Sequence, residues 1–283
     1  MKKKFLFLDG RMVKASDGLM EALTPGVVRR KGAFETICVV RGDVLSLEDH
    51  LARLLKGLKV LRVRASFSRK LLAGRIHRVL RVNHLRDARV RLAVWEENRR
   101  SRIAIVAEVF KRYSPSRYKK GWSAVIAETR RPQARFSHIK SLDYGCFRQA
   151  WSEAQKKKRD EAILLNRCGQ LVEGSRTNVF FARNGVLYTP LVRCGCLNGL
   201  TRRAVRDLSR RMGIPCRVTA ADARALKTAD EIFLTNSLIG IMPVTTLEDK
   251  RVGSGGPGPI TKKLIKAYCG KKHSSCPPRS KPL

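Results

Sequence analysis

The sequence lacks any long hydrophobic run. Its longest uncharged apolar run is about five residues, at 103–107, whereas a helix needs roughly 18 to cross a bilayer. Near the N-terminus, three lysines precede only four apolar residues before Asp9, which is too short for the apolar core of a secretory signal. The sequence therefore predicts a cytoplasmic protein that does not associate with a membrane.

Acidic residues are scarce. There are 23 Asp and Glu residues against 60 Lys and Arg, which gives a formal net charge of +37 and a pI near 10.9. Such a balance is typical of nucleic-acid binders. However, the basic residues recur along the whole chain, and no zinc-finger spacing or RRM-type aromatic signature accompanies them. The composition predicts a diffuse positive field that attracts anions, and it does not favour specific nucleic-acid binding.

Cysteine pairs at metal-ligand spacing are also lacking. Of the eight cysteines, only Cys194 and Cys196 form a close pair. No second pair of Cys or His residues accompanies them at the spacing of a metal site. We therefore expect no metal site.

Length and composition indicate two folded domains. A chain of 283 residues corresponds to about two domains, and 43% hydrophobic with 29% charged residues is a globular composition. Pro115 and its neighbouring serines lie among basic residues, as is typical of a linker. The sequence predicts a first domain at 1–112, a linker at 113–121, a second domain at 122–270 and a basic, disordered tail at 271–283.

Hydrophobic periodicity predicts mixed helix and strand in both domains. The first domain is expected to hold helices within 47–61 and 62–92 and strands at 89–95 and 102–110. In the second domain, Asn184-Gly185 predicts a two-residue hairpin turn. The strands expected there are 161–166, 171–173, 177–182, 186–189 and 231–235, and the helices are 199–212 and 260–268.

Two segments of the second domain have features of a phosphate site. Gly199 leads directly into a helix, whose first backbone N–H groups can bind a phosphate. Asn236 and Ser237 follow an apolar strand and could also reach one. Taken alone, each pattern is equally typical of an ordinary helix start or strand-ending turn.

Four segments of the chain, taken together and in this order, match the motifs of one enzyme family. They are residues 32–36 with His50, Arg53 and Leu54; residues 139–144; residues 161–162 and 173–180; and residues 198–202. Together they resemble the class IV, fold-type IV pyridoxal-phosphate enzymes, which include branched-chain and D-amino-acid aminotransferases and aminodeoxychorismate lyases. Segments 229–237 and 257–261 extend the similarity, which covers about residues 5–268.

The resemblance implies a two-domain α/β (α+β) fold that binds pyridoxal 5′-phosphate. The N-terminal domain would be a two-layer α/β structure and the C-terminal domain an α/β pseudo-barrel. Lys140 would bond to the cofactor and then move the substrate proton. Glu173 would face the pyridine nitrogen, and Arg53 would hold the phosphate. The further contacts it implies are Tyr144 to the ring hydroxyl, and Leu200, Thr201, Asn236 and Ser237 to the phosphate.

Three segments resemble the lyase branch of the family more than its aminotransferases: 32–36, 88–92 and 235–244. They favour an aminodeoxychorismate lyase, which releases pyruvate and forms 4-aminobenzoate. A branched-chain or D-amino-acid aminotransferase acting on amino and keto acids is the alternative, because the same lysine serves both reactions. The resemblance also implies a homodimer. Residues 25–31 depart from the acidic and aromatic stretch that borders the substrate pocket in many relatives.

A third interpretation belongs to a different functional class. A basic binding protein could keep this fold after losing the chemistry. Lys140, Glu173 and Arg53 are all present, which argues against that interpretation.

Overall fold

The computed structural model describes residues 4–26, 30–65, 67–132 and 136–270, which form two compact units. The first unit extends to Lys111 and also includes Ile139–Gly145, and the second contains the rest of the chain. The segment Ile139–Gly145, which contains Lys140, was expected in the second domain but belongs to the first unit. The expected tail at 271–283 lies outside the described residues, as does part of the divergent segment 25–31.

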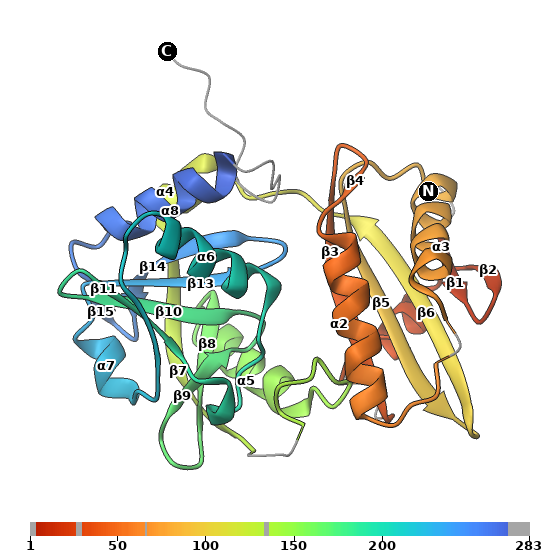
Figure 1. Ribbon diagram of the computed structural model, residues 1–283, viewed down its shortest axis with the longest axis horizontal. Helices are drawn as coiled ribbons and strands as arrows, with labels where there is room; N and C mark the ends of the chain where they lie inside the picture. The colour runs from red at the N-terminus through yellow and green to blue at the C-terminus, as the bar shows by residue number, and fades with distance from the viewer. Residues whose placement is uncertain (1–3, 27–29, 66, 133–135, 271–283) are drawn as a thin grey trace. The chain divides into compact units, whose positions relative to one another are not determined.

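The first unit is built on a six-stranded antiparallel sheet with the order β2-β1-β6-β5-β3-β4. Helices α2 (Leu47–Val60) and α3 (Arg69–Val82) cover one face (Figure 1). Apolar side chains of both helices form a core with that face. The strands are β1 (Phe5–Leu8), β2 (Arg11–Lys14), β3 (Gly32–Val40), β4 (Asp43–Val44), β5 (Ala88–Glu97) and β6 (Arg100–Val109).

Both expected helices of the first unit are present, but the second is shorter than the expected range 62–92. Helix α3 begins after Ser68, whose hydroxyl accepts a hydrogen bond from the Leu71 N–H. It ends at Val82, a few residues before β5 begins at Ala88. The apolar periodicity located the helix, and the cap set its start.

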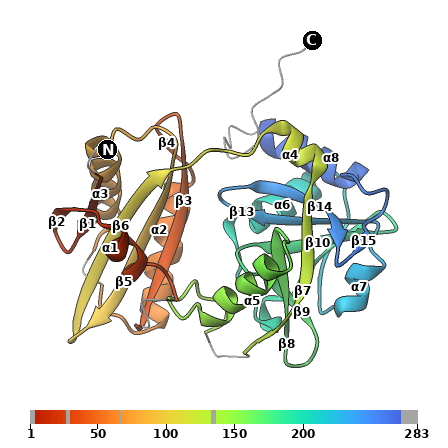
Figure 2. The ribbon, with the colours of Figure 1, turned by 180° about the vertical axis from the view of Figure 1, so that it is seen from behind.

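The segment that contains Lys140 pairs with the edge of β3, and its Lys140 and Leu142 side chains lie on the sheet face opposite α2 and α3. Ser141 forms an antiparallel bridge with Ala33, and the Phe34 N–H donates to the Lys140 carbonyl over 2.9 Å. Leu142 packs on the same face with Phe34 and Trp95. The short helix α1 (Asp17–Ala22) also lies on this side (Figure 2).

The second unit contains a nine-stranded mixed sheet with the order β12-β11-β10-β13-β14-β7-β8-β9, and β15 pairs with β14. Asn184 and Gly185 have φ values of 50° and 76°, which confirms the expected hairpin turn. The strands are β7 (Trp122–Arg131), β8 (Glu161–Asn166), β9 (Leu171–Gly174), β10 (Asn178–Arg183), β11 (Val186–Pro190), β12 (Cys216–Thr219), β13 (Glu231–Asn236), β14 (Gly240–Leu247) and β15 (Lys250–Arg251).

Helices α6 (Leu200–Arg211) and α8 (Pro259–Gly270) pack on one face of this sheet. The remaining elements are α4 (Pro115–Lys120), α5 (Gly145–Lys156), η1 (Val192–Cys194) and α7 (Ala223–Lys227). Helix α4 lies within the expected linker. Ser114 caps it, and the buried Tyr118 hydroxyl donates to the Ile239 carbonyl over 2.7 Å, so this segment is an ordered part of the second unit.

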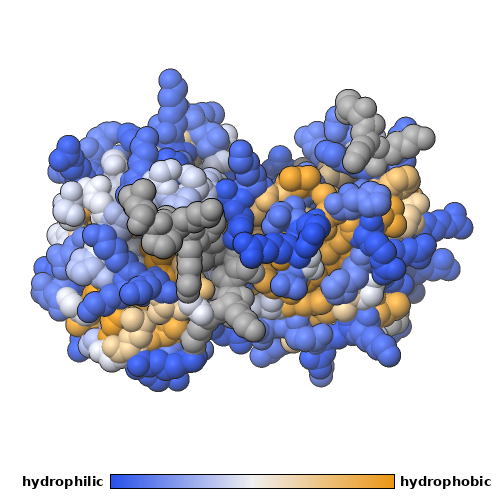
Figure 3. Space-filling model, turned by 90° about the horizontal axis from the view of Figure 1, so that it is seen from above, coloured by the Kyte–Doolittle hydropathy of each residue, from blue (hydrophilic) through white to orange (hydrophobic). Residues whose placement is uncertain are grey.

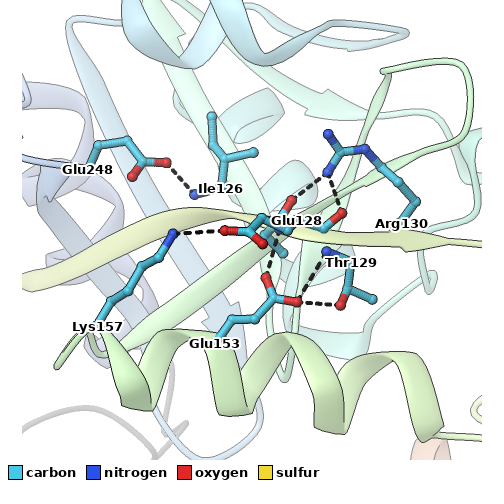
Figure 4. Close-up of polar contacts among 8 residues, drawn as sticks. Ile126, Glu128, Thr129, Arg130, Glu153, Lys157 and Glu248 are labelled. Carbon is cyan, nitrogen blue, oxygen red and sulfur yellow. Dashed lines mark hydrogen bonds and ion pairs between the residues drawn. The ribbon is translucent and has the colours of Figure 1, made fainter.

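A carboxylate on α5 stabilises an irregular stretch of β7. The pairing between β7 and β8 shifts register between Ile126 and Arg130. Within this stretch, Glu153 accepts hydrogen bonds from the backbone N–H groups of Glu128 and Thr129 at 2.7 and 3.1 Å (Figure 4). The side chain therefore replaces partners that the neighbouring strand does not supply.

On the face shown in Figure 3, hydrophilic side chains predominate, and apolar areas lie among them. Among the lysines and arginines that the structure describes, only Arg131 and Arg202 are buried. The large positive charge of the chain is therefore carried mainly by side chains in contact with water. No helix in the described part of the chain is long and apolar enough to cross a membrane.

Candidate functional site

Lys140 is held beside Phe34 by both its backbone and its side chain. Besides the hydrogen bond between the two backbones, the Lys140 Nζ lies 4.5 Å from the centroid of the Phe34 ring. Tyr144 packs edge-to-face on the same ring, with centroids 5.4 Å apart. The structure thus brings together two of the predicted site residues, Lys140 and Tyr144, on the face of the sheet opposite α2 and α3.

Arg53 of α2 is oriented by a fully buried carboxylate. Its Nε and Nη2 donate to the two oxygens of Glu35 at 2.7 and 2.6 Å, and His50 Nδ1 lies 2.7 Å from the same carboxylate. Burial alone would raise the pKa of Glu35, but the Arg53 charge and the hydrogen bonds outweigh it and lower the pKa to about 2. Among the described residues, no acceptor contacts Arg53 Nη1, so this atom can bind a further anion.

Two adjacent residues of β3 therefore serve two parts of the expected site. Successive side chains of a strand point to opposite faces of the sheet. Phe34 contacts Lys140 on one face, and Glu35 holds Arg53 on the other. This alternation explains why Phe and Glu are neighbours in the segment 32–36.

Arg91 is a functional candidate that the sequence analysis did not assign. It pairs across strands with Thr36, so it lies on the same face as Phe34 and Lys140. Its Nη1 donates to the Thr24 hydroxyl over 3.0 Å, and its Nη2 is 3.6 Å from Glu108. Burial lowers the pKa of the guanidinium, although the charge of Glu108 opposes this.

The Arg91 charge is only partly compensated. Its Nε is buried and has no hydrogen-bond partner within the described part of the chain. A desolvated guanidinium with unused donors favours a carboxylate ligand, which it can bind through two hydrogen bonds. The signal in the sequence was an arginine at each of two alternate positions, 89 and 91, in a strand whose other residues from 88 to 95 are apolar.

In the second unit, Glu173 joins a strand end to the loop before α6. Its carboxylate accepts hydrogen bonds from Asn178 Nδ2 and from the Leu197 N–H, both at 3.0 Å. Asn178 Nδ2 also donates to the Leu197 carbonyl over 2.8 Å. The acid expected to face the pyridine nitrogen is thus fixed to the segment that leads into the expected phosphate site.

Arg202 secures the same loop from within α6. Its side chain is fully buried and donates to the Thr189 hydroxyl, the Asn198 side-chain oxygen and the Pro190 carbonyl, at 3.1, 3.0 and 2.7 Å. None of these acceptors is charged. Burial lowers the pKa of Arg202, and its three hydrogen bonds hold the loop in place.

The start of α6 has the features expected of an anion site. As the first two helical residues, Leu200 and Thr201 have backbone N–H groups without an intrahelical partner. A Cβ at Gly199 would lie 2.1 Å from Asn178 Oδ1, so only glycine fits there. Thr235, the cross-strand partner of Asn178, has a buried hydroxyl without a partner among the described residues.

Asn236 and Ser237 form the turn between β13 and β14. The Asn236 oxygen accepts from the N–H groups of Leu238 and Ile239, each at 2.9 Å, and its nitrogen donates to the Arg176 carbonyl. Asn236 therefore shapes this turn through its side chain. Through the Arg176 carbonyl, it also links this turn to the loop between β9 and β10.

The two close cysteines are shielded from ionisation. Burial, and then the nearby Glu173 charge, raise the pKa of Cys196 to about 12. Burial also raises the pKa of Cys194. Both remain neutral thiols near neutral pH, and the described residues contain no group of three His, Cys, Asp or Glu side chains that could hold a metal ion.

The predicted residues are thus divided between the units. The first unit holds Arg53, Lys140 and Tyr144, and the second holds Glu173, Leu200, Thr201, Asn236 and Ser237. In the first unit Glu35 orients Arg53 while Lys140 and Tyr144 pack on Phe34, and in the second unit Arg202 holds the loop before Leu200 and Thr201. The sequence model of the amino-transferase class IV family matches residues 32–247, a range that includes all of these residues.

This chain belongs to the class IV aminotransferase family. A D-alanine aminotransferase from Bacillus licheniformis is 30% identical over 92% of this chain and 94% of that protein. An aminodeoxychorismate lyase from Bacillus subtilis (strain 168) is 26% identical over 88% of each chain. The resemblance expected from the sequence motifs is therefore confirmed, and the protein is a class IV aminotransferase-family enzyme.

Solved structures show that this class IV enzyme has the expected fold. The Escherichia coli branched-chain amino acid aminotransferase matches with a TM-score of 0.85 and 25% identity, over 99% of this chain and 98% of that chain. The T.th. branched-chain amino acid aminotransferase with pyridoxamine 5′-phosphate also has a TM-score of 0.85 and 25% identity, over 98% and 96% of the two chains. The two-domain α/β architecture is confirmed.

Proposed function

We propose that this class IV enzyme binds pyridoxal 5′-phosphate and acts on the amino group of a carboxylate substrate. The main supporting observation is that the Lys140 amine and the partly compensated Arg91 lie on one face of one sheet. An amine and a carboxylate receptor on the same face of a sheet form an arrangement that amino-acid chemistry can use.

The side chains present fit the cofactor. Its phosphate would be held by Arg53 Nη1, by the N–H groups of Leu200 and Thr201, and by the turn at Asn236 and Ser237. Two groups supply unused donors where that anion would bind. The first N–H groups of α6 have no intrahelical partner, and the Thr235 hydroxyl has no partner among the described residues. When bound, the cofactor withdraws electrons from the substrate carbon that carries the amino group.

Each remaining residue has a defined task. Lys140 would anchor the cofactor and then remove the proton from the amine-bearing carbon of the substrate. Glu173, already fixed by Asn178 and Leu197, would accept a hydrogen bond from the protonated pyridine nitrogen. Tyr144 would donate to the ring hydroxyl, and Arg91 would bind the substrate carboxylate.

For the reaction, we propose pyruvate elimination from aminodeoxychorismate. The segments 32–36 and 235–244 support it through their likeness to the lyase branch. Amino-group transfer from a branched-chain or D-amino acid is the second candidate, and the identity to a D-alanine aminotransferase supports it. Both reactions begin with the same proton removal by Lys140, and they differ in what leaves the substrate afterwards.

Covalent labelling tests the assignment of Lys140. Borohydride reduction of the purified, cofactor-loaded protein, followed by peptide mapping, should place the cofactor on Lys140. A label on another lysine would contradict the assignment. A chain without any visible absorbance from a lysine-bound cofactor, even after incubation with pyridoxal phosphate, would instead support a basic binding protein that has lost the chemistry.

A paired assay tests the reaction. Pyruvate release is followed with aminodeoxychorismate, and keto-acid formation is followed with leucine and with D-alanine in the presence of 2-oxoglutarate. We expect turnover with aminodeoxychorismate. Turnover with leucine or D-alanine alone would establish the aminotransferase instead.

A further inference from the structure

Glu108 lies between two arginines on the face of the first sheet that carries Lys140. It is the direct cross-strand partner of Arg89, whose Nη2 donates to Glu108 Oε2 over 2.7 Å. The same oxygen is 3.6 Å from Arg91 Nη2, which is beyond hydrogen-bond distance. One carboxylate oxygen therefore binds Arg89 closely and Arg91 only weakly.

The two arginines differ in how well they are satisfied and in how far they are exposed. The Arg89 side chain is 41% exposed and makes a short, charge-assisted hydrogen bond. The Arg91 side chain is 17% exposed, has a buried Nε without a described partner, and donates only to the neutral Thr24 hydroxyl at hydrogen-bond distance. If Glu108 turned toward Arg91, it would occupy the guanidinium that we assign to the substrate carboxylate.

We propose that Arg89 is a positioning residue that holds Glu108 away from Arg91 and thereby keeps Arg91 available to the substrate carboxylate. This inference rests on the carboxylate-binding role of Arg91 in the proposed function. Arg89 itself does not touch the reacting atoms. Its effect passes through Glu108, so removing Glu108 should cancel the effect of removing Arg89.

Glu108 would compete with the substrate carboxylate for Arg91 if Arg89 did not hold it. In an R89A variant, its carboxylate loses the 2.7 Å hydrogen bond and keeps Arg91 as a cationic neighbour at 3.6 Å, with the charge of Lys4 also acting on it. A shift of about 1 Å in side-chain position would convert the 3.6 Å contact into a charge-assisted hydrogen bond of normal length. A substrate carboxylate would then have to displace it.

Calorimetry on the cofactor-loaded protein measures this competition without relying on turnover. The probe is 4-methylvaleric acid, a monocarboxylate without an amino group, and 4-methylvaleramide is its neutral counterpart. For R89A we expect the dissociation constant of the acid to rise about tenfold, as for loss of a charged hydrogen bond. The value for the amide and the visible absorbance of the bound cofactor should not change.

The double variant decides between competition and general damage. R89A/E108Q should bind the acid as wild type does, because the glutamine cannot neutralise Arg91. R102A is a matched control, since Arg102 is 43% exposed and pairs with Asp9 on the same sheet, and it should leave binding of the acid unchanged. An unaltered dissociation constant in R89A, or a raised one that E108Q does not correct, would overturn the proposal.

A third variant separates this proposal from the proposed function. R91M should weaken binding of the acid in every background while leaving the amide unaffected. If R91M has no such effect, or if wild type binds the acid no better than the amide, Arg91 is not the carboxylate receptor and the proposed function fails at that residue. If R91M weakens binding but R89A does not, only the positioning role of Arg89 is lost.

Discussion

Buried charges in this protein are placed where a side chain must hold one geometry. Glu35 is fully buried with Arg53 and His50 as neighbours, and Arg202 is fully buried with only neutral acceptors. Burying an ion costs several kcal/mol even after the surroundings relax. These residues are therefore better explained by the geometry they impose on Arg53 and on the loop before α6 than by a gain in stability.

Glu35 should give the stability of the first unit a defined pH dependence. Its pKa is lowered from 4.5 to about 2, so its stabilising effect is complete above about pH 4.5 and is lost as the pH falls through 2. The shift corresponds to about 3 kcal/mol. Urea unfolding of wild type and E35Q between pH 7 and pH 2 should show a difference in unfolding free energy that shrinks over this range. A difference independent of pH would contradict the ionised state of Glu35.

Arg202 should affect cofactor affinity as well as folding. In R202M, three acceptors lose their donor, at about 1–3 kcal/mol for each one left unsatisfied, and the loop carrying Leu197 and Asn198 is released. We expect the dissociation constant for pyridoxal phosphate to rise at least tenfold, with partial recovery in R202K. Fluorescence titration measures it, with R206M on the same helix as control. A loss of stability with unchanged cofactor affinity would assign Arg202 to folding alone.

At the scale of single elements, β7 depends on α5 for part of its hydrogen bonding. Glu153 accepts from two consecutive N–H groups of the irregular stretch, where the pairing with β8 is interrupted. E153A should lower the unfolding free energy by about 1–2 kcal/mol and speed amide exchange at Glu128 and Thr129. K157A, just beyond the end of the same helix, removes only an exposed ion pair and should change stability by less than about 0.5 kcal/mol. Equal effects of the two substitutions would refute this role of Glu153.

Elements defined by local patterns could be predicted from the sequence. The strand at 161–166 and the hairpin turn at Asn184-Gly185 occur where periodicity and turn chemistry placed them. The membership of Ile139–Gly145 in the first unit could not be predicted, because it depends on a bridge between Ala33 and Ser141, far apart in the chain. Arg91 was missed for the same reason, since only the strand register reveals that it shares a face with Phe34 and Lys140.

At the scale of the whole molecule, the net charge of +37 opposes any association of two copies of the chain. The resemblance to class IV enzymes nevertheless predicts a homodimer. Charges on separate chains are screened beyond about 8 Å at physiological ionic strength, but only beyond about 30 Å at 0.01 M salt. Repulsion between the copies should therefore control assembly through the salt concentration.

Light scattering over a salt series tests this expectation on the intact protein. We expect a dimer at physiological salt and a shift toward monomer near 0.01 M. At the lower salt concentration, charges on the two strongly basic chains repel one another over about 30 Å. Activity measured in the same samples should fall with the dimer fraction. A dimer that persists at low salt would mean that apolar contacts at the interface outweigh the repulsion. A monomer that is fully active at both salt concentrations would show that a second copy is not needed for the reaction.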